Sequence, residues 1–144
     1  MNNYFEVQIE YENATDKPTL CGVLEFENDV RAIKDGDKGK FIKQFKGIVD
    51  GKGVLGHMEM SPYNSTLQFR KFAKDHASSV FSLKTNRDFV FSGTCDTSGT
   101  KQPENVSFTK FVCLSDEEVQ EKGIKETLNK GYKEIGFGLE RELS

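Results

Sequence analysis

Apolar and polar residues alternate along most of the first 113 positions of the chain. In the first run, Phe5, Val7 and Ile9 are separated by Glu6 and Gln8. A period of two residues is typical of a strand with one buried face. The pattern therefore predicts a strand over about 5–11. It returns over 20–26 after a polar turn, which predicts that the two strands form a hairpin.

Six further segments have the composition of strands. They are 40–49, 54–60, 66–72, 79–83, 88–95 and 105–113. Asp50-Gly51 separates the first two of these segments and is typical of a tight hairpin turn. The order predicts a mainly β fold, an antiparallel up-and-down barrel or a strongly curled sheet of about eight or nine strands. The residues expected in its core include Phe5, Ile9, Phe26, Phe91 and Phe108.

A single helix is predicted after these strands. Ser115 and Glu118 have the spacing of a capping box, in which each side chain satisfies a backbone amide of the other residue. The helix is expected to cover about 115–130 and to end at Gly131. Gly123 in its interior should weaken it by about 1 kcal/mol. Alternation over 135–139 predicts a short final strand.

The pattern F-x-G-x-x-D-x-x-G occurs twice, starting at Phe45 and at Phe91. The aromatic residue would anchor the core, and the first glycine would let a strand bend or another chain cross it. The aspartate and the second glycine would form a turn. We interpret the repeat as recurring hairpin chemistry, with an internal duplication as the alternative.

Eight up-and-down strands followed by a helix and one more strand is an order that resembles the lipocalin-type (calycin) barrels. The resemblance is architectural and covers nearly the whole chain. The chain has no Trp, so the G-x-W signature of lipocalins is absent. The resemblance implies a cup-shaped barrel with a ligand cavity, and it carries over no binding or catalytic residue.

The composition is that of a folded protein. The chain has 144 residues, of which 35% are hydrophobic and 30% charged, and it contains twelve Phe. Its mean hydropathy is -0.59. This length predicts one domain over 1–144. The net charge of -3 argues against binding to nucleic acids or membrane surfaces, because both usually require a basic excess.

The N-terminus has neither the basic region nor the apolar run of a signal peptide. A cytoplasmic location is therefore expected if Met1 is the native start. Three glycosylation sequons, at Asn13, Asn64 and Asn105, keep a secreted protein as the alternative.

The cysteines do not form a recognisable metal or disulfide pattern. Cys21, Cys95 and Cys113 are far apart in the sequence, so we expect three reduced, unligated thiols. The stretch 35–39 has the D-x-D-x-G opening of a calcium loop, but position twelve of that loop would be Lys46 instead of a glutamate. No metal or cofactor is expected.

The sequence also gives little support to an enzyme. His57 and His76 are the only histidines, which leaves few ways to build a histidine-based site. The sequence His57-Met58-Glu59 matches the H-x-E half of a zinc deaminase motif, but the cysteine half is absent. An enzyme whose residues meet only in the fold, around His57, Glu59 and Tyr63, is the least supported function.

Three lysines occupy positions on otherwise apolar strand faces. Lys43 lies between Phe41 and Phe45, Lys71 follows Phe69 and Lys110 follows Phe108. A buried ammonium group is costly unless it is paired. Each lysine alone could be a strand-end residue that extends to water.

Together the three lysines could instead meet one anionic ligand, and the phenylalanines named with them would then form its apolar wall. Arg70 and Arg87 are further candidates for binding an anion. These residues favour a non-catalytic protein that binds a small anionic ligand with an apolar or aromatic part. The alternative is a protein–protein interaction module, such as an inhibitor or an assembly component.

Overall fold

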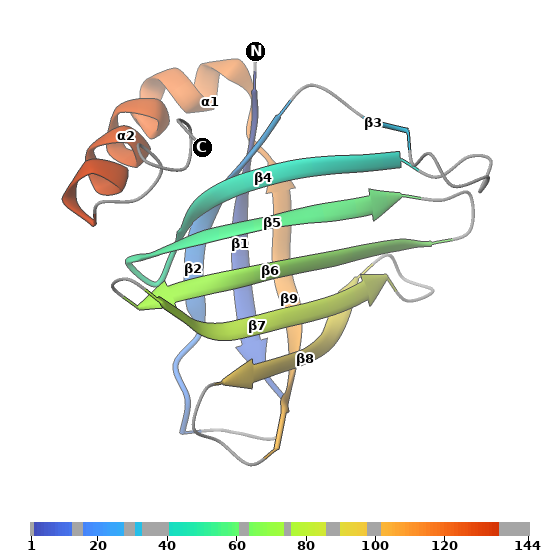
Figure 1. The fold of residues 1–144 in the computed structure, drawn as a ribbon. Helices are drawn as coiled ribbons and strands as arrows, with labels where there is room; N and C mark the ends of the chain where they lie inside the picture. The colour runs from blue at the N-terminus through green and yellow to red at the C-terminus, as the bar shows by residue number, and fades with distance from the viewer. Residues whose placement is uncertain are drawn as a thin grey trace.

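The residues that the computed structural model describes form a closed barrel of eight antiparallel strands (Figure 1). These residues are 2–12, 16–27, 31–32, 41–60, 64–73, 76–85, 90–97 and 102–135. The barrel strands are β1 (Asn3–Tyr11), β2 (Leu20–Phe26), β4 (Phe41–Val49), β5 (Lys52–Met60), β6 (Ser65–Ala73), β7 (His76–Thr85), β8 (Phe91–Thr97) and β9 (Glu104–Cys113). The predicted mainly β fold is confirmed.

Each barrel strand pairs with the next barrel strand along the chain, and β9 returns to pair with β1. The circle is completed between β2 and β4, where Gly22–Phe26 pairs with Val49–Phe45. The two-residue strand β3 (Arg31–Ala32) pairs with the start of β4, outside this circuit. The up-and-down order follows from the short connections between successive strands, since antiparallel neighbours need only a hairpin turn.

Phenylalanines fill the barrel interior. Phe69 and Phe81 stack with their ring centroids 4.5 Å apart and an interplanar angle of 7°. Phe45 and Phe108 contact the ring of Phe69 edge-on. The burial predicted for Ile9, Phe26, Phe91 and Phe108 is confirmed. Phe5 is half-buried and stacks on Phe111, with ring centroids 4.8 Å apart.

The first glycine of the repeated pattern lies at a close approach between strands in both copies. A Cβ atom on Gly47 would lie 2.2 Å from the carbonyl oxygen of Val23, and one on Gly93 would lie 2.0 Å from that of Ser82. The tight curvature of the barrel therefore depends on these glycines.

The second half of the repeat behaves differently in the two copies. The β4–β5 turn is formed by Asp50 and Gly51, both with positive φ, as expected of an Asp-Gly hairpin turn. Gly53 lies inside β5, and Asp96 lies inside β8, where it pairs with Val80. The prediction that the aspartate and the second glycine form a turn is therefore wrong, because Gly51 replaces Gly53 in the first copy and Asp96 is extended.

The C-terminal helical region consists of two helices, α1 (Asp116–Glu121) and α2 (Ile124–Glu134). The capping box of Ser115 and Glu118 is confirmed. The single helix ending at Gly131 is not. Gly123 adopts the left-handed conformation and separates the helices, whereas Gly131 lies inside α2. A Cβ atom on Gly131 would lie 2.3 Å from Cδ1 of Ile48, so this glycine allows α2 to approach the barrel.

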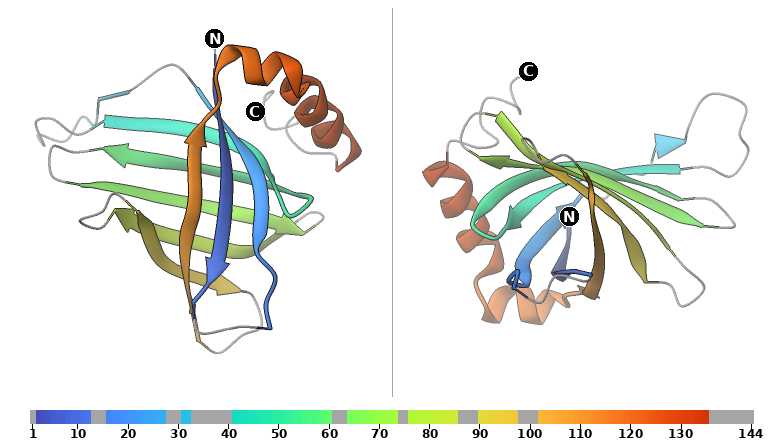
Figure 2. Two further views of the ribbon diagram at one scale, coloured as in Figure 1. Left: turned by 180° about the vertical axis from the view of Figure 1, so that it is seen from behind. Right: turned by 90° about the horizontal axis from the view of Figure 1, so that it is seen from below.

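The helices cover one side of the barrel exterior, next to β1, β2 and β4 (Figure 2). Outward-facing apolar residues of the barrel meet the apolar face of the helices in a second core. Its buried residues are Tyr4, Leu114, Val119, Leu128 and Tyr132. The helices therefore complete the fold from the outside and leave the barrel interior to the phenylalanines.

The predicted final strand cannot be compared in full. Ile135 ends α2, and 136–144 lie outside the described residues. Among the residues that the structure describes, no helix is long and apolar enough to cross a membrane.

Candidate functional site

A lysine side chain lies inside the apolar barrel. Lys71 is 6% exposed and follows Leu67 and Phe69 on the inward face of β6. Its Nζ lies 6.0 Å from the ring centroid of Phe81 and 4.0 Å from Oδ2 of Asp50. Asp50 can contact Lys71 because it lies in the β4–β5 hairpin turn, which is at this end of the barrel.

The surroundings of Lys71 disfavour its charged form. Burial lowers the pKa of Lys71, and the nearby charge of Lys52 lowers it further. The carboxylate of Asp50 and the thiol of Cys95 act in the opposite direction and raise the pKa. The balance is a lowered pKa, so an anion placed beside this amine would stabilise its charged form.

A chain of polar side chains lies at the same end of the barrel interior. The hydroxyls of Ser79 and Thr97 are 3.3 Å apart, and the Thr97 hydroxyl is 3.6 Å from the sulfur of Cys95. Tyr11 belongs to the same group, because the Cys95 thiol contributes to its raised pKa. Burial, the Cys95 thiol and the charges of Glu104 and Asp50 raise the pKa of Tyr11 to about 12.

Strand register explains why these groups meet. Lys71 pairs with Ser79, and Ser79 pairs with Thr97, so one row of the sheet carries three polar inward-facing side chains. We call Lys71, Ser79, Cys95, Thr97 and Tyr11 the polar end of the barrel. The lysine was predicted from the sequence, whereas its neighbours were not. The sequence signal for these neighbours would have been the inward positions of Ser79 and Thr97 on their strands.

Lys43 lies at the opposite end of the interior. It is half-buried on β4, and its row continues through Met58 to Leu67. Leu67 and Lys71 are four residues apart on β6, which corresponds to about 13 Å along the strand. The aromatic layer of Phe45 and Phe69 lies between the two rows. Lys43 and Lys71 therefore do not converge.

Lys110 lies on the outside of the barrel, and the predicted convergence of three lysines is wrong. The register between β1 and β9 shifts so that Gln8 pairs with Lys110 but Ile9 pairs with Phe108. The extra residue, Thr109, is a β-bulge, which reverses the side of the sheet that the following residues face.

The outer face supplies an ion pair for Lys110. Its Nζ lies 2.5 Å from Oε1 of Glu6, and Nζ of Lys122 lies 3.7 Å from Oε2 of the same carboxylate. The hydrogen bond from Lys110 is the largest cause of the lowered pKa of Glu6. This lysine is therefore satisfied by the protein itself.

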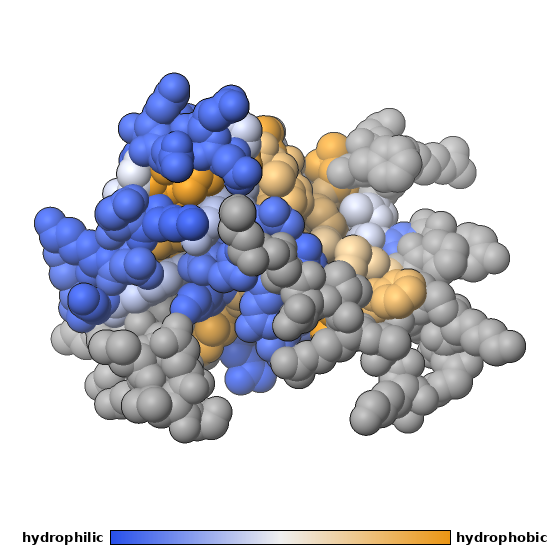
Figure 3. Space-filling view, turned by 90° about the horizontal axis from the view of Figure 1, so that it is seen from above, coloured by the Kyte–Doolittle hydropathy of each residue, from blue (hydrophilic) through white to orange (hydrophobic). Residues whose placement is uncertain are grey.

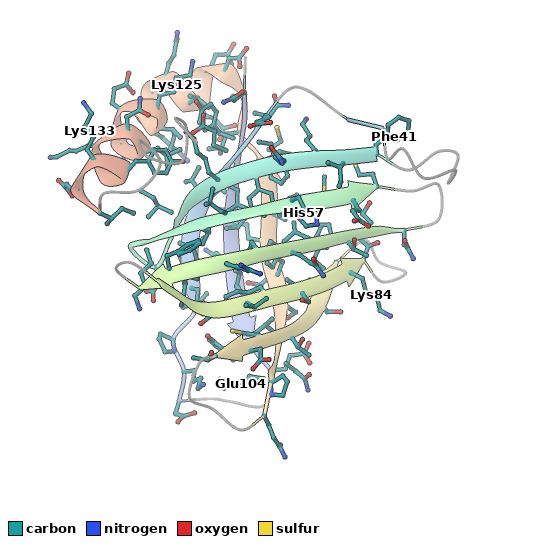
Figure 4. All side chains as sticks on the ribbon, viewed as in Figure 1. Phe41, His57, Lys84, Glu104, Lys125 and Lys133 are labelled. Carbon is teal, nitrogen blue, oxygen red and sulfur yellow. The ribbon has the colours of Figure 1, made fainter. Side chains whose placement is uncertain are left out.

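The remaining predicted residues have different positions. Phe45, Phe69 and Phe108 are core residues, whereas Phe41 is 43% exposed at the start of β4 (Figure 4). Arg70 is exposed and lies on the outer face of β6, next to the inward Lys71. Arg87 lies outside the described residues.

The histidine–carboxylate pair lies on the outer surface. Nε2 of His57 and Oε1 of Glu59 are 4.0 Å apart, and the two side chains are 36% and 45% exposed. Figure 4 labels His57 on β5. Tyr63 lies outside the described residues. Within the described ranges, no group of three or more His, Cys, Asp or Glu residues is arranged to hold a metal ion. All three cysteines are free thiols, as predicted.

Comparison of the chain with protein-family models, with curated proteins and with solved structures gave no significant match. The functional argument therefore depends on the geometry of the barrel.

Proposed function

We propose that the protein is a non-catalytic binding protein for a small anionic molecule, whose charged group is held at the polar end of the barrel. The observation that carries the proposal is the position of Lys71, a lysine residue that is 6% exposed and whose Nζ lies 6.0 Å from the centroid of the Phe81 ring. Burial disfavours the charged form of Lys71 even though the Asp50 carboxylate lies 4.0 Å away. An anionic ligand would offset that cost, and it would therefore bind the folded protein more tightly than the unfolded chain.

The neighbouring groups suit an anion with a polar head. The hydroxyls of Ser79 and Thr97 can donate hydrogen bonds to a carboxylate or phosphate oxygen. Asp50 opposes such a ligand, but its side chain is 48% exposed and belongs to a surface turn. The ring of Phe81 beside Lys71 is fully buried, so the apolar or aromatic part of the ligand would lie outside the packed core.

The architecture agrees with this proposal at the level of the fold. An eight-stranded antiparallel barrel is compatible with a calycin-type ligand binder, and such barrels bind ligands at their open ends. The free thiols of Cys21 and Cys113, both exposed, support a reducing compartment such as the cytoplasm.

A thermal-shift screen tests the proposed function. The probes are AMP, cyclic AMP, benzoate and octanoate, which differ in the size of the anion and of the apolar part. A bound probe at a hundredfold excess over its Kd should stabilise the protein by about 2.7 kcal/mol. The shift should be lost in Lys71→Met and retained in Lys110→Met, the matched variant on the outer face.

Lys71→Met should remain folded, because the methionine side chain has about the volume of the lysine stem and the substitution removes a buried charge. An unchanged shift in Lys71→Met would refute the site. If none of the probes binds and native mass spectrometry of the purified protein shows no retained small molecule, the interaction module takes its place.

A further inference from the structure

A cavity lies outside the barrel, between the start of β1 and the two helices. Its volume is about 340 Å³, within the range of sites for small molecules. Tyr4, Leu114 and Val119 line it and are each 7% exposed, so they form an apolar floor. Seen from above, the surface of the molecule carries both hydrophilic and hydrophobic residues (Figure 3).

The Glu25 carboxylate connects the start of the chain, which lines the cavity, to α2. The Asn2 side-chain amide donates to Glu25 over 2.6 Å, and the Tyr132 hydroxyl donates to its other oxygen over 3.2 Å. Tyr4 is the neighbour of Glu25 across the β1–β2 pair, and the Glu25 carboxylate raises its pKa. Tyr4 is packed in the second core with Leu114, Val119 and Tyr132, so the floor is formed before any ligand arrives.

The charges around the cavity favour a cation. Asp116 and Glu126 line it with carboxylates, and Lys125 is the opposing charge among the lining residues. The negative surroundings reach the floor: burial, then Glu25, then Glu126 raise the pKa of Tyr4 to about 12. The phenol is therefore neutral at physiological pH and adds no charge to the floor.

We propose that this cavity binds a small organic ammonium ion with an apolar body. The ammonium group would lie between the carboxylates of Asp116 and Glu126, and the apolar body would contact Tyr4, Leu114 and Val119. The ligand is opposite in charge to the one proposed for the barrel interior, and the two sites share no residue. This inference does not depend on the function proposed above.

Titration of the full chain with benzylamine, followed by amide NMR shifts, tests the cavity. The amides of Tyr4, Val119 and Gln120 should shift with one common saturation curve. Benzoate, which has the same ring and the opposite charge, should leave these amides unchanged. Glu126→Gln and Asp116→Asn should each weaken benzylamine binding by about twofold to fivefold, the range for exposed ion pairs.

Glu117→Gln is the matched control, because Glu117 lies on the same helix as Asp116 and is not among the lining residues. It should leave benzylamine affinity unchanged, as should Lys71→Met. Equal shifts with benzoate, an absence of saturation, or an equal loss in Glu117→Gln would each overturn the proposal.

Discussion

Truncation of Phe69 should remove the centre of the aromatic core. Its side chain is 2% exposed, stacks on Phe81 at 4.5 Å and receives edge contacts from Phe45 and Phe108. Phe→Ala changes in cores cost about 3–5 kcal/mol. We expect Phe69→Ala to lie near the upper end of that range, because three other rings lose a partner and cannot all collapse into the space.

The expected loss is a large fraction of the total. A chain of 144 residues has a free energy of unfolding of about 7–22 kcal/mol at typical values per residue. Phe41→Ala is the matched control, since Phe41 is 43% exposed at the start of β4. Its cost should stay below about 1 kcal/mol.

Equilibrium unfolding in urea measures both variants, with far-UV circular dichroism and tyrosine fluorescence as independent probes. Coincident transitions would justify a two-state analysis. Similar losses in Phe69→Ala and Phe41→Ala would refute the reasoning, because the interior would then not be close-packed around Phe69. A loss below about 1 kcal/mol in Phe69→Ala would do the same.

Three further predictions concern other parts of the barrel. Cys21 and Cys113 should react with a thiol reagent in the native protein, and Cys95 only after denaturation, giving three thiols in total; a total of one would contradict the free thiols. Gly47→Ala should lower the free energy of unfolding by more than the ordinary variation of about 0.5 kcal/mol at surface sites, because its Cβ would lie 2.2 Å from a carbonyl oxygen; an unchanged urea midpoint would show that the strands can separate freely. The pKa of Lys71 is lower in the folded protein than its ordinary value of 10.5, so between these two pKa values the unfolded chain binds more protons than the folded one. The free energy of unfolding of the parent, relative to Lys71→Met, should therefore rise with pH across this window and stay constant below it. The opposite slope in urea unfolding would contradict the burial of the charge.

The strands were predictable because their signal is local. Alternation of apolar and polar residues identifies a half-buried strand without knowledge of its neighbours. Asp50-Gly51 likewise specifies its own turn through its backbone preferences. The capping box at Ser115 is a contact across three residues, and it also appears as predicted.

Features that depend on a distant neighbour were not predictable. The bulge at Thr109 arises between β1 and β9, and it places Lys110 on the face opposite to the one expected from alternation. The roles of Gly123 and Gly131 were exchanged because the sequence does not reveal that α2 packs against Ile48. The polar neighbours of Lys71 come from other strands, so only the register brings them together.

The pairing of β1 with β9 has a consequence for the time order of folding. Glu6 and Lys110 are 104 positions apart, so the hydrogen bonds along this side of β1 form only after nearly the whole barrel has been synthesised. Contacts between such distant segments slow folding, because the chain must close a long loop first. During synthesis, β1 has one unpaired edge until β9 leaves the ribosome, and an unpaired edge can recruit other strands. A growing chain of this protein should therefore depend on protection from association until its last barrel strand appears.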